Sequence, residues 1–134
     1  MSLNIFFNID MNIEKQVELL VLFKKTMIEF LDELIEQFDQ EGDLIVLRFF
    51  LSEQIPLETI MNQFNSYVYP MKDMIKNRDE KFFLERDNIF GSSPKDKVIH
   101  FKELYMKMAK DDRVTLWTWF DTFIMICEKY KKLN

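Results

Sequence analysis

Residues 112–132 read DRVTLWTWFDTFIMICEKYKK, and this stretch decides the predicted fold. Its large apolar residues recur at three- and four-residue steps, which predicts a helix. They are Leu116, Trp117, Phe120, Phe123, Ile124 and Cys127. Trp119 and Ile126 widen the stripe until most of the helix circumference is apolar. A helix of this kind belongs in a core, so we expect it to be central, with the other helices around it.

The first half of the chain also predicts helices. In residues 12–41 the helical spacing is carried by Val17, Leu20, Met27, Leu31, Leu34 and Phe38. Gly42 is a natural stop for this helix, and Asp43 can cap the next one. The apolar run 44–51 suits a second helix or a buried strand. We favour the helix because no other segment offers a strand with which it could pair.

The second half continues the pattern. Pro56 suits the first turn of a third helix, and Pro70 ends or kinks it. A short helix over 71–76 follows, and Asn77 with Glu80 suggests a capping box for another short helix. After a loop over 86–92, Ser93 and Pro94 predict the start of a helix that reaches about Lys110. We therefore predict an all-α protein of five to seven helices, with an N-terminal arm over 1–11 and a single compact domain over 12–134.

The composition favours association over catalysis. The 134 residues include 14 Phe and 9 Met but only one His, one Cys and two Gly. Phosphate-binding loops need glycines, metal sites need clustered His or Cys, and nucleophile triads need a base. We therefore expect no enzyme activity, no cofactor and no metal.

Two groups of charged residues are candidates for a metal site or a catalytic site. The pairs Glu29/Glu33 and Asp32/Glu36 place carboxylates on one helix face, but a di-metal bundle would also need His partners. His100 precedes Glu103 by three residues, so on a helix the carboxylate would orient the imidazole. Since the sequence places no nucleophile beside them, we interpret both groupings as surface charge.

Other features of the sequence indicate the cellular environment of the protein. Cys127, the single cysteine, has no partner for an internal disulfide, which suits a reducing compartment. The longest uncharged apolar runs are far shorter than a membrane span. We expect a soluble intracellular protein that is not inserted in a membrane.

Charge is uneven along the chain and leaves one alternative open. Residues 1–53 hold eleven acids and four bases (net −7), whereas residues 54–134 hold twelve acids and fourteen bases (net +2). An acidic total disfavours nucleic-acid binding, yet the basic stretch 72–102 keeps it as the alternative function. Its candidate contacts are Lys72, Lys76, Arg78, Lys81, Lys95, Lys97 and Lys102.

The preferred function is protein–protein association. The aromatic residues together exceed what a small domain readily hides, and an exposed aromatic patch marks a contact surface. The candidate interface consists of Phe6, Phe7, Trp117, Trp119, Phe120 and Phe123. We expect it to serve self-association, giving an oligomer, or the binding of a protein partner.

Four segments carry a resemblance to a known group of proteins. They are MKDMIKNRDEKFFL (71–84), NIFG (88–91), LWTWF (116–120) and EKY (128–130). With them, residues 30–132 resemble uncharacterised helical proteins of nucleocytoplasmic large DNA viruses. The resemblance implies a viral source and a place in the host cytoplasm, the nucleus or the virion, and it transfers no active site.

Overall fold

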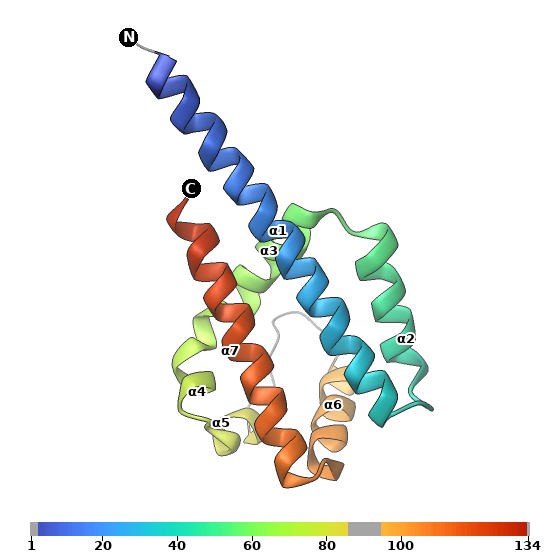
Figure 1. The fold of residues 1–134 in the computed structure, drawn as a ribbon. Coiled ribbons are helices and arrows are strands. Elements are labelled where there is room, and N and C mark those ends of the chain that lie inside the picture. Colours follow the sequence, from blue (N-terminus) through green and yellow to red (C-terminus); the bar gives the residue numbers. More distant parts are fainter. Residues whose placement is uncertain (1–2, 86–94, 134) are drawn as a thin grey trace. The chain divides into compact units, whose positions relative to one another are not determined.

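The computed structural model describes the backbone of residues 3–85 and 95–133, and the side chains of residues 10–85 and 99–133. All described elements are helical, so the predicted all-α class is confirmed (Figure 1). The contacts divide the chain into two compact units. The first unit comprises Met1–Asn62 with Met125–Asn134, and the second comprises Gln63–Ile124. The expectation of one domain over 12–134 stays a prediction.

In the first unit, the long helix α1 (Leu3–Gln37) packs on part of its predicted stripe: Val17 is 48% exposed, and Phe23, which was not in the predicted stripe, is buried. Leu20, Phe23, Leu31 and Leu34 are buried at steps that keep them on one side of the helix. After a turn at residues 38–41, α2 (Gly42–Phe49) runs back beside the second half of α1, as Figure 1 shows in turquoise. A π-helical turn, Phe50–Gln54, continues it.

Polar contacts join α2 and its π-helical extension to α1. Arg48 forms a two-pronged ion pair with Asp32 of α1. The Lys24 ammonium donates to the carbonyl oxygen of Ser52 over 2.8 Å. Leu44 and Leu51 are buried, and α2 contacts α1. The side of the helix that carries these two leucines is therefore the packed side of α2.

The first unit also holds the start of α3 (Leu57–Tyr67) and the end of α7 (Lys110–Lys132). Near the C-terminus, the Gln16 side-chain amide donates to the Leu133 carbonyl oxygen over 2.8 Å. This bond ties the end of the chain to α1. Cys127, with 0% of its surface exposed, lies in the buried part of this segment.

The second unit holds the rest of α3 and α7, a 3-10 turn Tyr69–Met71, and three shorter helices. These are α4 (Lys72–Lys76), α5 (Glu80–Glu85) and α6 (Lys95–Lys107). An aromatic cluster joins α5, α6 and α7 edge to face: the ring centroids of Phe83 and Tyr105 are 5.1 Å apart, and those of Tyr105 and Trp117 are 6.1 Å apart. Such pairs add to the free energy gained by burying the rings.

Three boundaries differ from the prediction in the first half of the chain. Helix α1 begins at Leu3 and not at Asn12, so its first turns include residues of the predicted arm. Gly42 is the first residue of α2 and not a stop, because the chain already turns at 38–41 through a Glu41 N–H bond to the Phe38 carbonyl. Asp43 lies in the first turn of α2, whose N-cap is Glu41.

Two further boundaries differ in the second half. Asp79, and not Asn77, caps α5, because its carboxylate accepts the Phe82 N–H over 3.0 Å. Helix α6 ends at Lys107, before the expected Lys110. The helix expected over 44–51 is confirmed. The predicted loop over 86–92 and the Ser93–Pro94 cap lie outside the described residues.

Candidate functional site: the outer face of α2

The structure places the predicted aromatic interface residues in different environments. Trp117 and Phe123 are core residues with 6% and 1% of their surface exposed, and Trp119 and Phe120 are half-buried. The side chains of Phe6 and Phe7 lie outside the described residues. The interface stays a prediction, to which Trp117 and Phe123 would contribute only if their packing opened.

Trp117 and Phe123 are held by specific contacts within the second unit. The Trp117 indole N–H donates to the Tyr105 hydroxyl oxygen over 3.0 Å. The Phe123 ring meets Phe64 edge to face at 6.0 Å and Phe120 at 5.7 Å. These contacts give both side chains a structural role in the core.

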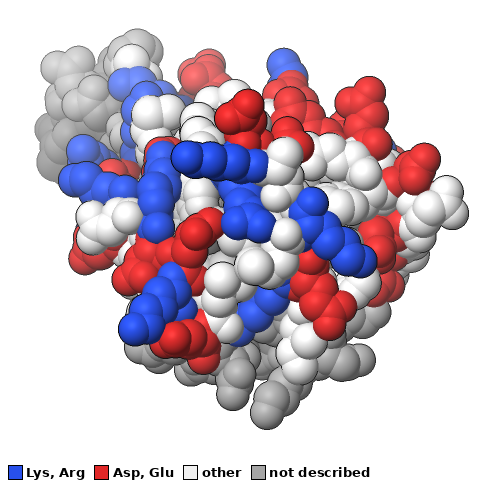
Figure 2. All heavy atoms as spheres, turned by 90° about the horizontal axis from the view of Figure 1, so that it is seen from below, with Lys and Arg blue, Asp and Glu red and all other residues white. Residues whose placement is uncertain are grey.

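The basic residues of the alternative function are interspersed with acids. Figure 2 shows Lys and Arg side chains alternating with Asp and Glu on one face of the molecule. Among the predicted contacts, Lys72 lies over the Tyr69 ring at 5.0 Å, and Lys102 donates to the Leu84 carbonyl oxygen over 3.1 Å. Lys76 and Lys81 are exposed, whereas the side chains of Lys95 and Lys97 lie outside the described residues.

Arg78 serves the local fold. Its φ of 54° puts it in the left-handed region, as the residue after a helix C-cap that glycine usually occupies. The guanidinium holds this conformation through bonds to both carboxylate oxygens of Asp121, at 2.9 and 2.5 Å, and to the Ile75 carbonyl oxygen at 2.8 Å. The Asp121 carboxylate raises the pKa of Arg78. Its charge is therefore already matched within the second unit.

The charged groupings weighed as catalytic or metal sites lie on open surface. His100 Nδ1 and Glu103 Oε2 are 3.8 Å apart, and both side chains are substantially exposed. Among the α1 carboxylates, Asp32 pairs with Arg48. In the part of the chain that the structure describes, no three His, Cys, Asp or Glu side chains are grouped to hold a metal ion.

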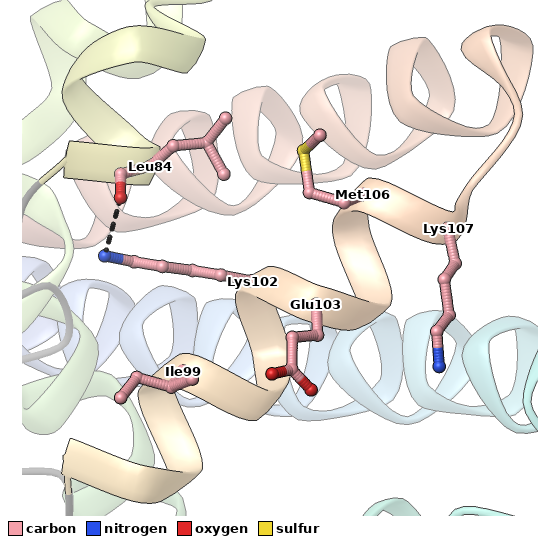
Figure 3. Close-up of a pocket in the computed structure, with 6 residues that line it drawn as sticks. All are labelled: Leu84, Ile99, Lys102, Glu103, Met106 and Lys107. Atoms are coloured by element: carbon pink, nitrogen blue, oxygen red, sulfur yellow. Dashed lines mark hydrogen bonds between the residues drawn. The ribbon is translucent and has the colours of Figure 1, made fainter.

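A shallow hollow of about 480 Å³ lies along α6. Its lining consists of Leu84, Ile99, Lys102, Glu103, Met106 and Lys107. Figure 3 shows Lys102 reaching across it to the backbone of Leu84. Because all the lining except Leu84 comes from one helix, the hollow lacks the opposing wall with which ligand pockets enclose their ligands.

The clearest surface feature is the outer face of α2, which we define as Ile45, Val46, Phe49 and Phe50. These side chains are 50%, 52%, 52% and 46% exposed. They occupy the side of the helix away from Leu44 and Leu51, which are buried. Helix α2 is thus apolar on both sides, a pattern that normally indicates burial on both sides.

The sequence around this face is acidic. Residues 38–59 contain five acids and one base, a net charge of −4. The one base, Arg48, lies 40% exposed toward α1 in the ion pair with Asp32. The acids include Asp43 before the face and Glu53 after it.

The sequence pattern does not single out the outer face of α2. The run 44–51 predicted a helix, but periodicity does not distinguish an exposed apolar side from a buried one. The available signal was that every residue of this run except Arg48 is apolar, so that one side had to lie away from the partner helix. Further exposed apolar residues lie on the first half of α1, among them Ile13, Val17 and Val21.

No protein-family model, curated protein or solved structure matches the chain. Among the helices described over residues 3–85 and 95–133, none combines the length and the apolar character needed to cross a membrane. The resemblance to viral helical proteins stays a prediction.

Proposed function

We propose that this is a non-enzymatic interaction protein whose contact surface is the outer face of α2. The observation that carries the proposal is the half-exposure of four neighbouring large apolar side chains on α2 and the start of its π-helical extension. Isolated exposed apolar residues are ordinary, but a contiguous group marks a surface that another molecule covers.

The size of the face supports binding and limits its strength. With roughly 200 Å² on each phenylalanine side chain, half-exposure of Phe49 and Phe50 alone makes an apolar area of about 200 Å², and the smaller Ile45 and Val46 add to it. At roughly 25 cal/mol per Å², covering the two rings yields about 5 kcal/mol before the cost of association, which is of similar size or larger. Apolar burial alone therefore gives weak binding, and polar contacts at the rim must supply the rest.

The anchors are of the kinds that dominate binding energy. Phe49 and Phe50 lie edge to face with ring centroids 5.9 Å apart, so each restricts the other. Aromatic residues held in this way lose little conformational freedom when a partner arrives. Ile45 and Val46 continue the surface one turn earlier.

Site-specific photocrosslinking in the cells that express the protein tests the proposal. The photoreactive residue p-benzoylphenylalanine replaces Phe49 in one variant and Phe101 in a control, since both are exposed phenylalanines in helices. We expect a discrete crosslinked protein from position 49 that is absent from position 101, and we expect Val46→Glu to remove it. Equal crosslinking at both positions, or none at position 49, contradicts the proposal.

A further inference from the structure

Helix α5 packs over buried aromatic rings without being buried itself. None of its six residues is buried, and Phe82, Phe83 and Leu84 are half-buried. The Phe83 ring meets Tyr105 at 5.1 Å and Trp117 at 6.0 Å, in both cases edge to face. Tyr105 and Trp117 are only 2% and 6% exposed. A short segment with few buried side chains is the kind of element that opens locally while the rest of a protein stays folded.

Polar contacts fix both ends of α5. At its start, the Tyr105 hydroxyl donates to a Glu80 carboxylate oxygen, and the Arg113 guanidinium lies 3.7 Å from the same oxygen. At its end, the Lys102 ammonium donates to the Leu84 carbonyl oxygen over 3.1 Å. The Glu80 side chain is 47% exposed, so water competes for its contacts. These contacts hold α5 closed without preventing its release.

The turn that leads into α5 is strained. Arg78 has a φ of 54°, in the left-handed region that is costly for a residue with a Cβ atom. Its guanidinium maintains this conformation through the bonds to Asp121 and to the Ile75 carbonyl oxygen. Strain of this kind persists where the surrounding structure imposes it, and it gathers at segments that switch. Residues 77–79 are therefore a natural hinge for α5.

We infer that α5 is a strap that opens on this hinge while the other helices of the second unit stay folded, and that its opening exposes the rings of Tyr105 and Trp117. When closed, the strap keeps Trp117 in the core. When open, it exposes a residue that the sequence predicted for a protein interface. This inference goes beyond the proposed function and uses no residue of the outer face of α2, so its failure leaves that proposal standing.

Hydrogen exchange of the Trp117 indole N–H, followed by NMR on the full-length protein, tests the inference. This N–H is buried and donates to the Tyr105 hydroxyl oxygen, so it exchanges when α5 opens or when the second unit unfolds. Backbone amides of α7 over 119–124 provide the reference for unfolding. After correction for intrinsic exchange rates, we expect the indole N–H to be at least about tenfold less protected than these amides. Its exchange should also respond little to low concentrations of urea, because a local opening exposes little surface. Protection equal to that of the α7 amides would overturn the inference.

Three variants distinguish opening of the strap from unfolding. Glu80→Ala removes the contacts at the start of α5 and should accelerate exchange of the Trp117 indole N–H about tenfold. Lys81→Ala, at the exposed neighbouring residue of α5, should leave this exchange nearly unchanged. Phe64→Leu weakens the core contact between Phe64 and Phe123, which the open state keeps, so it should accelerate exchange of the α7 amides and not of the indole N–H.

Circular dichroism checks that each variant is helical. Equal effects of Glu80→Ala and Lys81→Ala on the indole N–H would overturn the inference. Equal acceleration of the indole N–H and the α7 amides by Phe64→Leu would also overturn it, because both would then exchange through the same unfolding.

Discussion

Replacing Tyr105 with phenylalanine should destabilise the second unit through one hydroxyl group. Tyr105 is 2% exposed, accepts the Trp117 indole N–H at 3.0 Å and donates to a Glu80 carboxylate oxygen. Arg113 completes the group, with its guanidinium 5.0 Å from the Tyr105 ring centroid and 3.7 Å from the same Glu80 oxygen. The substitution removes the hydroxyl and leaves the ring packing in place.

The magnitude follows from the groups left without a partner. The Trp117 N–H belongs to a buried side chain, and a buried donor without an acceptor costs about 1–3 kcal/mol. Glu80 loses a donor but is exposed, so water replaces most of that bond. We therefore expect Tyr105→Phe to lower the free energy of unfolding by about 2 kcal/mol.

Urea unfolding followed by tryptophan emission measures this change. Both tryptophans of the chain, Trp117 and Trp119, lie in the second unit, so their emission reports its unfolding. We expect a lower midpoint with an unchanged slope, because the surface exposed on unfolding stays the same. A loss below about 0.5 kcal/mol, the usual size of a surface substitution, would refute the reasoning.

A double-mutant cycle isolates the bond between the two aromatic side chains. Trp117→Phe removes the indole N–H, so in that background Tyr105→Phe should lose most of its cost of about 2 kcal/mol. Trp119 still supplies the emission signal in these variants. If the cost is the same in both backgrounds, the Trp117–Tyr105 bond does not carry the effect.

Four further outcomes follow from the structure. Burial, with the hydrogen bond to Glu80, raises the pKa of Tyr105 from 10.0 to about 12, so the unfolded chain loses this proton first. Stability should therefore be intact below pH 10 and fall toward pH 12 in urea titrations, with a smaller fall for Tyr105→Phe. Burial also raises the pKa of the Cys127 thiol, so a thiol reagent should label it only as the first unit opens; immediate labelling of the folded protein would contradict this. Both Arg78→Gly and Arg78→Ala lose the contact with Asp121, but only glycine adopts the left-handed backbone conformation without strain. By urea unfolding, Arg78→Gly should therefore be about 1 kcal/mol more stable than Arg78→Ala. Equal stabilities of the two variants would show that no strain is relieved. Val46→Glu should leave the thermal midpoint nearly unchanged, since its side chain is half exposed, and a fall of more than a few degrees would place it in the core.

The sequence predicted the helices well where local chemistry determines them. Pro56 precedes α3, and Pro70 follows its end, because proline fixes its own backbone angle and removes a donor. Asp79, and not Asn77, caps α5. Which of two nearby residues caps a helix depends on the exact path of the turn before it. Local signals thus predicted the element types better than their ends.

The candidate site was harder to predict because exposure depends on packing between distant segments. Trp117 is buried and donates its indole N–H to Tyr105, which lies on another helix. No spacing within residues 112–132 predicts this hydrogen bond. Conversely, the outer face of α2 is exposed although α2 packs on α1 through its other side. Apolar sequence predicts burial in general and does not specify which apolar side remains for a partner.

The photocrosslinking yield at position 49 in the expressing cells tests the central proposal most directly. With the control at position 101, the account predicts one dominant crosslinked protein at position 49 and its loss when Val46→Glu is added. Crosslinking that is equally weak at both positions would show that the outer face of α2 is not a contact surface and would contradict the account.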